Sequence, residues 1–338
     1  KNQSAFSIGD GSAEGRQDAP DSKEARAVCE HIEKPPKMIV SGCGYFTDGG
    51  YVVGKPCMLP YSNVIAGDKG GFVVTQNGGG FTFFDNSCEN KATFWSADPV
   101  EDMPSEKLFA VIDGKRLRVN KLDPGGYVLH GRGQSVFCGR AEGVSYRLTL
   151  GLIRRGEGKV YRLRLENREK FSRSVTLEFS LLLQLSRIYE PFSVKVSPFK
   201  EGLKAVNVLT GNAAFVKCLG GCEVVCKKDV AKVKGKKRSC GAYAPCAELR
   251  KNISLSAEGC LEIYFLICSS EEVFDECNEE NIGYMIEEGL KTFEFESEVE
   301  LFGVPEEERA LMRALPYQVY SSRLKGRCGF DLAGGARG

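Results

Sequence analysis

Strand-like segments follow one another from about residue 40 to residue 268, and this succession restricts the fold more than any other feature. In KVYRLRLEN (159–167), apolar and charged residues alternate, which is the two-residue period of a strand with one wet face. Many strands with glycine-containing turns and no helical periodicity between them indicate a mainly β fold, a large antiparallel β-sandwich. Further segments of this kind include GFVVTQ (71–76), VSYRLTL (144–150), SVTLEFSLLLQL (174–185) and CLEIYFLIC (260–268).

The pattern divides the chain into four parts. Residues 1–36 are a polar tail, and residues 37–268 are the β-sandwich domain. Residues 269–304 are acidic and predict a helical linker, with Ile282, Ile286 and Leu290 on one apolar stripe. The last part, 305–338, begins with proline and three glutamates, which is typical of a helix start. Its expected apolar face consists of Leu311, Leu315, Val319 and Tyr320.

Composition argues against several classes of partner. The chain has 338 residues, with 46 Lys and Arg against 45 Asp and Glu, so a net charge of +1 favours neither nucleic acid nor a membrane surface. No apolar run approaches the roughly 18 residues of a membrane span. The N-terminal tail lacks the apolar stretch of a signal peptide. We therefore expect a cytoplasmic protein whose 14 cysteines are reduced thiols.

Metal ligation is not predicted. The nearest approach to a metal motif is Cys218, Cys222 and Cys226, which are separated by three residues instead of two and have no fourth ligand nearby. A structural zinc site closes with four Cys or His ligands, and the chain has only two histidines. Of these, His130 is interpreted as a structural residue between two strands. No cofactor is expected.

Segment 60–104 carries the residues best suited to a sugar. It holds the only tryptophan, a glycine triplet between two apolar runs, and a dense row of Asn, Asp and Glu. Planar polar side chains and one aromatic face suit hydroxyl-rich ligands, although a hairpin followed by a polar loop would look the same. Spacing does not show whether two carboxylates converge, as a glycosidase requires. The substrate-binding candidates are Trp95, Asn86, Glu89, Asn90 and Asp98.

The order of several segments resembles the N-terminal β-sandwich of glycoside hydrolase family 94, formerly glycosyltransferase family 36. That family includes cellobiose, cellodextrin and β-1,2-oligoglucan phosphorylases and the phosphorylase-like part of cyclic β-1,2-glucan synthases. The resemblance starts with PYSNVIAGDKGGFVVTQNGGGFTFFDNSCENKATFWSADPVED (60–102). It continues with YVLHGRGQSVF (127–137), RLRLENRE (162–169), APCAELRKNISL (244–255) and LPYQVYSSRLKGRCGF (315–330).

The resemblance implies a galactose-mutarotase-like supersandwich, a helical linker and then an (α/α)6 barrel, of which 305–338 would be the truncated start. In the family the barrel holds the general-acid Asp, and inorganic phosphate is the co-substrate. We therefore expect no catalytic residue in this chain and no activity from it alone. The implied partners are a β-linked gluco-oligosaccharide and, in the full-length parent, a second copy in a homodimer. Arg327, in the last matching segment, is a further substrate-binding candidate.

Two functions remain open on these grounds. The chain is either the N-terminal, non-catalytic part of an inverting β-glucan phosphorylase, or a stand-alone carbohydrate-binding or assembly module from a truncated gene. In the first case the sandwich supports the barrel and the dimer, and loop 85–102 reaches the active site of the neighbouring subunit.

Overall fold

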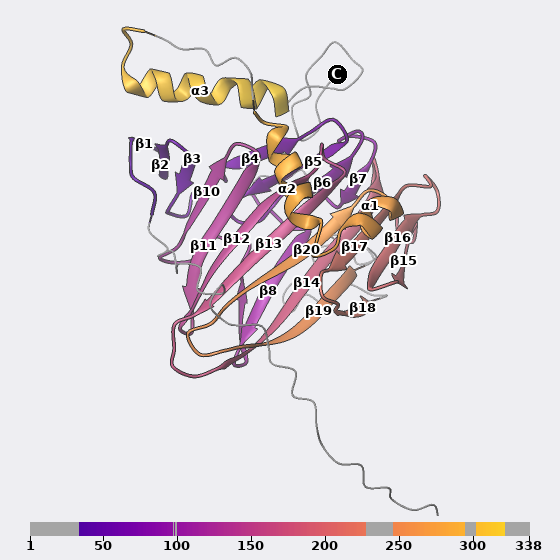
Figure 1. The fold of residues 1–338 in the computed structure, drawn as a ribbon. Helices are drawn as coiled ribbons and strands as arrows, with labels where there is room; N and C mark the ends of the chain where they lie inside the picture. Colours follow the sequence, from indigo (N-terminus) through magenta and orange to yellow (C-terminus); the bar gives the residue numbers. More distant parts are fainter. Residues whose placement is uncertain (1–33, 97, 99, 228–245, 295–301, 322–338) are drawn as a thin grey trace, which may run out of the picture. The chain divides into compact units, whose positions relative to one another are not determined.

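The strand-like segments pair into two large antiparallel sheets in a computed structural model of the chain (Figure 1). The structure describes residues 34–96, 98, 100–227, 246–294 and 302–321. In this part of the chain, all strands lie before residue 269 and the helices follow them. The expected mainly β, antiparallel sandwich is confirmed.

Sheet one has eleven strands. Its centre is a run of long strands that pair with their sequence neighbours, and β20 joins them from much later in the chain. In spatial order the strands are β1 (Ile39–Ser41), β2 (Gly44–Thr47), β3 (Gly50–Val53), β10 (Tyr127–Gly131), β11 (Gln134–Ala141), β12 (Val144–Ile153), β13 (Gly158–Asn167), β20 (Cys260–Cys268), β17 (Ala213–Cys218), β16 (Gly202–Asn207) and β15 (Val194–Phe199).

Sheet two has nine strands and is organised around β14 (Arg173–Ser186). The first part of β14 pairs with β19 on one side and β8 on the other, and its last residues pair with β7 after a register shift. The main path runs through β18 (Glu223–Lys227), β19 (Cys246–Leu255), β14, β7 (Lys91–Thr93), β6 (Thr82–Phe84), β5 (Gly70–Thr75) and β4 (Ser62–Ala66). Off this path, β8 (Glu106–Ile112) also pairs with β9 (Lys115–Arg118).

The core lies between the two sheets. Because side chains alternate across a strand, one set from each long strand points inward and forms a single apolar cluster. Leu148 and Leu163 from sheet one and Leu177 and Phe179 from sheet two are fully buried members of it. Burial of this continuous layer is the main force that holds the sandwich closed.

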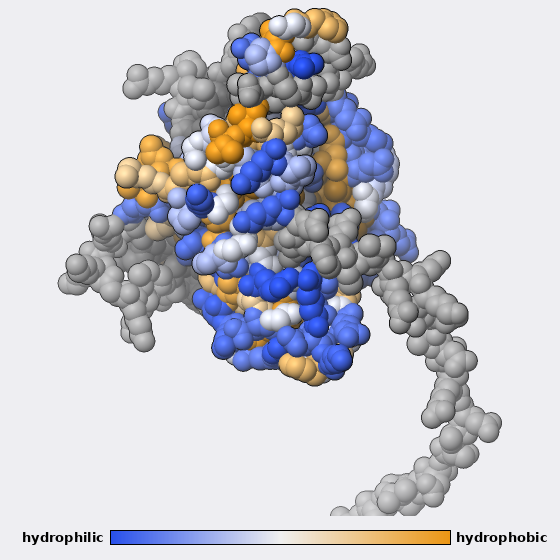
Figure 2. Space-filling model, turned by 90° about the vertical axis from the view of Figure 1, so that its left-hand side faces the viewer, coloured by the Kyte–Doolittle hydropathy of each residue, from blue (hydrophilic) through white to orange (hydrophobic). Residues whose placement is uncertain are grey.

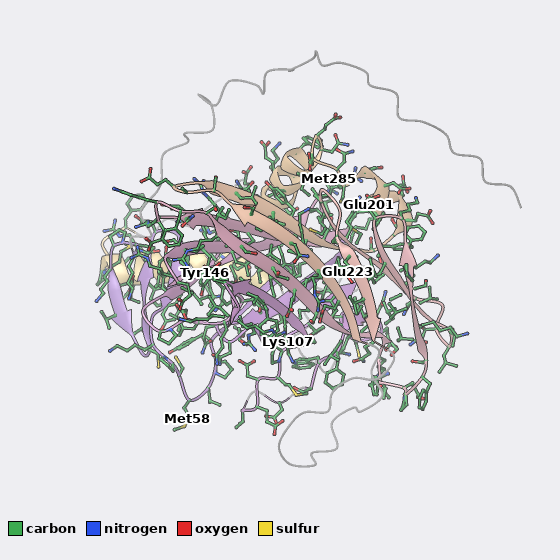
Figure 3. The ribbon with its side chains drawn as sticks, turned by 90° about the horizontal axis from the view of Figure 1, so that it is seen from below. Met58, Lys107, Tyr146, Glu201, Glu223 and Met285 are labelled. Carbon is green, nitrogen blue, oxygen red and sulfur yellow. The ribbon has the colours of Figure 1, made fainter. Side chains whose placement is uncertain are left out.

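Two helices, α1 (Glu271–Glu276) and α2 (Ile282–Lys291), cover the outer face of sheet one near β17 and β20. Phe274 of α1 and Met285 of α2 are buried there with outward-facing residues of β13 and β20, such as Val160 and Leu266. Figure 3 labels Met285 in this position, on the side of sheet one that points away from sheet two.

The buried face of α2 matches the expected stripe at Ile282 and Ile286 and differs from it at Leu290. Ile282, Met285 and Gly289 are buried, whereas Leu290 is 37% exposed. The reason is a close approach at Gly289, where an added Cβ would lie 2.1 Å from the carbonyl oxygen of Leu152 in β12. This contact rotates the helix so that Leu290 points outward.

The third helix, α3 (Glu306–Ser321), buries only part of the expected face: the partly buried Tyr320 packs on the core, with its ring 6.0 Å from that of Phe293. Tyr317 is buried, and its hydroxyl lies 2.6 Å from the carbonyl oxygen of Val64 in the edge strand β4. Leu315 and Val319 are 43% and 52% exposed, while the side chain of Leu311 is outside the described residues. A free carbonyl at a sheet edge attracts the tyrosine hydroxyl, and this hydrogen bond turns the aliphatic residues away.

Hydrophilic and hydrophobic residues are mixed over the face of the molecule shown in Figure 2, with hydrophilic ones predominating toward its lower end. No helix in the described part of the chain is long and apolar enough to cross a membrane.

The docking of α1 predicts a large effect of one substitution. Phe274 is fully buried, with its ring 5.4 Å from that of Phe199 and 6.2 Å from that of Phe215. Phe274→Ala should lower the free energy of unfolding, measured with urea, by about 3–5 kcal/mol. The control Tyr284→Ala, at a side chain that is 61% exposed, should change it by less than about 0.5 kcal/mol. Equal effects would contradict this packing.

Candidate functional site

The glycine triplet forms the turn between β5 and β6, and the loop 94–105 folds against it. Gly78 and Gly80 have positive φ angles of 73° and 108°, which favour glycine. At Gly79 an added Cβ would lie 1.7 Å from Oδ1 of Asp102, so only glycine allows this approach. The other carboxylate oxygen of Asp102 accepts a hydrogen bond from Thr75 Oγ1 at 2.7 Å. The three glycines therefore let the loop lie directly on the sheet.

Trp95 belongs to this loop and packs on sheet two. Its ring centroid lies 5.1 Å from that of Phe81, and both contact a small apolar cluster that includes Val73 and Phe83. Farther along the loop, Ser105 Oγ donates to the carbonyl oxygen of Gly80 at 3.0 Å. Trp95 is partly exposed on a backbone that is anchored at both ends.

The polar candidates before Trp95 mainly build a turn. Asn86 Oδ1 accepts from the amides of Cys88 at 2.8 Å and Glu89 at 3.0 Å, which is an Asx turn. The exposed Glu89 carboxylate lies 3.4 Å from the Arg187 guanidinium. The carbonyl oxygen of Asn90 accepts from the amide of Phe84 at 3.1 Å and closes the β6–β7 hairpin.

Asp98 has a similar local role. Its Oδ1 accepts from the amides of Val100 at 2.8 Å and Glu101 at 3.1 Å, and so fixes the backbone of the loop. Arg327 lies outside the described residues.

The five candidates that the structure describes are therefore not gathered at one point. Asn86, Glu89 and Asn90 lie at the closed end of the β6–β7 hairpin. Trp95 and Asp98 follow the other end of β7. The paired residues Phe83 of β6 and Lys91 of β7 lie between these two groups of candidates.

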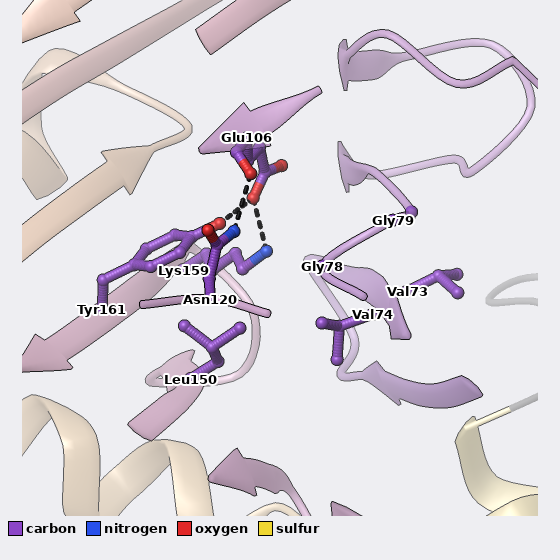
Figure 4. Close-up of a pocket in the computed structure, with 10 residues that line it drawn as sticks. Val73, Val74, Gly78, Gly79, Glu106, Asn120, Leu150, Lys159 and Tyr161 are labelled. Carbon is purple, nitrogen blue, oxygen red and sulfur yellow. Dashed lines mark hydrogen bonds and ion pairs between the residues drawn. The ribbon is translucent and has the colours of Figure 1, made fainter. Parts of the chain in front are cut away.

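Sequence reasoning missed a buried charged cluster just after the loop. Glu106, the first residue of β8, lies between the sheets, and Lys159 Nζ of β13 is 2.5 Å from its Oε2. The hydroxyls of Thr82 and Thr93 donate to Oε1 at 2.6 and 2.7 Å, and the Tyr161 hydroxyl donates to Oε2. Figure 4 shows Lys159 and Tyr161 converging on this carboxylate from the opposite sheet.

Burial and pairing have opposite effects on the pKa values of this cluster. Burial alone would raise the pKa of Glu106, but the Lys159 ammonium and the hydrogen bonds from Lys159, Thr82 and Tyr161 outweigh it and hold that pKa below its usual value. Burial lowers the pKa of Lys159, and the attraction of Glu106 opposes this shift. A charged pair joins the two sheets.

The space beside the cluster is too small for a sugar. It is a cavity of about 10 Å³, lined by Gly78, Gly79 and Gly80 on one side and by Glu106 and Lys159 on the other. This volume corresponds to about one water molecule. The cluster is therefore a structural junction beneath the glycine turn, and not a binding pocket.

A signal for this junction was present in the sequence. Tyr161, Leu163 and Leu165 occupy the inward positions of β13, and two residues earlier the same alternation reaches Lys159. A lysine at a core-facing position implies a buried anionic partner, because unpaired buried charges are rare.

The remaining titratable candidates are buried or dispersed. Burial lowers the pKa of His130 to about 4, and its Nδ1 lies 3.0 Å from Ser135 Oγ, so the ring is neutral at pH 7. Among the described residues, no group of three His, Cys, Asp or Glu side chains could hold a metal ion. Cys218 and Cys268 are buried free thiols, whereas Cys260 is exposed.

Two packed antiparallel sheets of this size, with helices on one outer face, define a β-supersandwich. Residues 51–182 match the family model "Glycosyl hydrolase 94, supersandwich domain". This match confirms, for residues 51–182, the resemblance noted in the sequence.

Solved structures share only low similarity with the chain. A human-microbiome protein designated a kojibiose phosphorylase is 11% identical with a TM-score of 0.42, and the match covers 85% of this chain and 40% of that one. A bacterial glucoamylase complexed with acarbose is 10% identical with a TM-score of 0.43, covering 77% and 39%. A 4-alpha-glucanotransferase from Thermococcus litoralis is 10% identical with a TM-score of 0.37, covering 71% and 40%.

At these identities and TM-scores, the similarities carry no inference about function. The chain spans about two fifths of the length of each of these three proteins. A comparison with curated proteins finds no match.

The junction predicts that removing one charge of the Glu106–Lys159 pair lowers the free energy of unfolding more than removing both. Lys159→Met leaves the Glu106 carboxylate buried without a cation, which should cost about 3–5 kcal/mol in the free energy of unfolding. The double variant Glu106→Gln/Lys159→Met should recover most of that loss, because no unpaired charge remains. Urea unfolding of the three proteins measures this difference. A double variant no more stable than the single one would contradict the ion pair.

Proposed function

We propose that the chain is the N-terminal, non-catalytic part of an inverting β-glucan or oligosaccharide phosphorylase, which transfers a glycosyl group to inorganic phosphate. The observation that carries this proposal is the family 94 match over residues 51–182. In this proposal the sandwich supports a barrel that holds the general acid and the phosphate site. The expected partners are a β-linked gluco-oligosaccharide and a second subunit.

The geometry of the described residues is consistent with a supporting role. The one charged cluster that we find fully enclosed between the sheets has room for about one water molecule, and the polar residues of 86–98 mainly cap turns. Exposed Leu315 and Val319 on α3 offer an apolar surface against which further helices could pack.

Within this proposal, loop 85–102, which strand β7 interrupts, presents Trp95 to the substrate site of the neighbouring subunit. The loop is well suited to this role because Asp102 and Ser105 fix its backbone to the glycine turn. An aromatic side chain on a rigid backbone loses little conformational entropy when a sugar ring packs on it.

An assay with sophorose, cello-oligosaccharides and inorganic phosphate tests the proposal. The 338-residue chain alone should release no sugar 1-phosphate, whereas the longer enzyme implied by the proposal should release it. Phosphate-dependent turnover by the chain alone would contradict the non-catalytic assignment. Heat of binding at millimolar sugar, without turnover in either protein, would favour a carbohydrate-binding module instead.

If the loop contributes to the substrate site, a substitution of Trp95 should change the kinetics of the longer enzyme although this residue is not part of the barrel. In the longer enzyme, Trp95→Ala should lower kcat/KM by about tenfold, which corresponds to the loss of one aromatic contact with the sugar. The matched control is Phe94→Ala, because the neighbouring Phe94 ring packs on Tyr189 at 5.9 Å and so faces another part of the protein. Unchanged kinetics for Trp95→Ala, with unaltered thermal unfolding, would exclude this role.

A further inference from the structure

Among the residues that the structure describes, part of strand β20 in the middle of sheet one has no pairing strand on one side, which leaves an open edge. On one side β20 pairs with β13 along its whole length, from Cys260 to Cys268. On the other side β17 pairs only with residues 265–268, and the last backbone hydrogen bond runs from the amide of Leu219 to the carbonyl oxygen of Tyr264. Beyond that point the chain turns away toward β18 in sheet two.

The backbone of Glu262 faces this open edge. In a central antiparallel strand, successive residues direct their N–H and C=O groups to opposite neighbours. Tyr264 points toward β17, so Glu262, two residues earlier, points the same way but past the end of β17. The hydrogen bond to the other neighbour confirms this alternation, because the carbonyl oxygen of Gly259 accepts from the amide of Asn167, the last residue of β13.

A groove runs along the open edge. Its volume is about 520 Å³, within the range of ligand sites in proteins. The β17–β18 turn at Gly220 forms one wall, and the start of α2 at Gly283 forms the other. Figure 1 shows β17, β20, α1 and α2 next to one another in this part of the molecule.

The groove lining has an excess of negative charge, with three glutamates and one lysine. Glu279 and Glu280 line it, and neither forms an ion pair with a described residue. Glu262 is already paired with Arg162 at 2.7 Å. The one lysine of the lining, Lys251, donates all three ammonium protons to the carbonyl oxygens of residues 219–221 at 2.8–3.0 Å.

We propose that this groove binds an extended peptide with basic side chains, which adds to the open edge of β20 as a short strand. The peptide backbone would bond to the N–H and C=O groups of Glu262, as in other cases of β-strand addition. Its lysine or arginine side chains would contact Glu279 and Glu280.

Hydrogen exchange on the complete chain tests the backbone part of the proposal. The probe is a synthetic peptide, Lys-Thr-Lys-Val-Lys-Thr-Lys, with blocked ends. At saturating peptide, the amide of Glu262 should exchange at least about tenfold more slowly, while the amides of Leu261 and Ile263 are already protected by β13. Methylating the backbone nitrogens of alternate peptide residues should abolish binding for one set and preserve it for the other.

Two sets of variants locate the site. Gly283→Trp should abolish binding by filling the groove, since no atom lies within 4 Å of an added Cβ there. Gly54→Trp, at a glycine with equal space but away from the groove, is the control. The double variant Glu279→Gln/Glu280→Gln should weaken binding about tenfold or more.

The charge-matched control for that double variant is Glu272→Gln/Glu287→Gln, which removes two exposed carboxylates outside the groove and should leave binding unchanged. No protection of Glu262, or equal weakening by both pairs of variants, would overturn the proposal. Heat with sophorose that disappears in Gly283→Trp, without peptide binding, would assign a sugar site and also overturn it. Neither result bears on the phosphorylase assignment, which depends on the assay of turnover.

Discussion

The ion pair between Glu106 and Lys159 is the interaction on which the arrangement of this sandwich depends. Here a charged side chain of sheet two meets one of sheet one inside a mainly apolar layer. Hydrophobic burial closes the sandwich but is not directional, whereas a buried carboxylate with four donors requires one relative position of β6, β7, β8 and β13. The pair therefore determines the relative position of the two sheets more than it contributes to the free energy of folding.

The same junction connects the core to the surface loop. Glu106 directly follows Ser105, which holds Gly80, and its own carbonyl oxygen accepts from Asn120 Nδ2 at 2.7 Å. One end of the loop is thus tied to the interior of the protein, and Asp102 and Trp95 tie the rest to the glycine turn and Phe81. In the proposed enzyme, the position of Trp95 would be set by a charge pair beneath it.

Much of the fold could be predicted from the sequence, because strand alternation and glycine turns are local signals. The buried face of a helix could not be predicted, because it depends on backbone carbonyl groups from other parts of the chain. Gly289 of α2 lies against the carbonyl oxygen of Leu152, and the Tyr317 hydroxyl of α3 donates to that of Val64. The candidate site shows the same limit. Asn86 and Asp98 have the chemistry of sugar ligands, but hydrogen bonds to nearby amides occupy Oδ1 of each side chain. Lys159 was visible in the alternation, yet its partner lies 53 residues away.

The dependence of stability on pH tests the central role of the ion pair most directly. The folded pKa of Glu106 lies below its unfolded value of about 4.3, so the pair's contribution is complete above that pH and is lost as pH falls through the folded pKa. The free energy of unfolding of the native chain should therefore fall more steeply below about pH 4.3 than that of Glu106→Gln/Lys159→Met. Parallel curves for the two proteins would contradict the account.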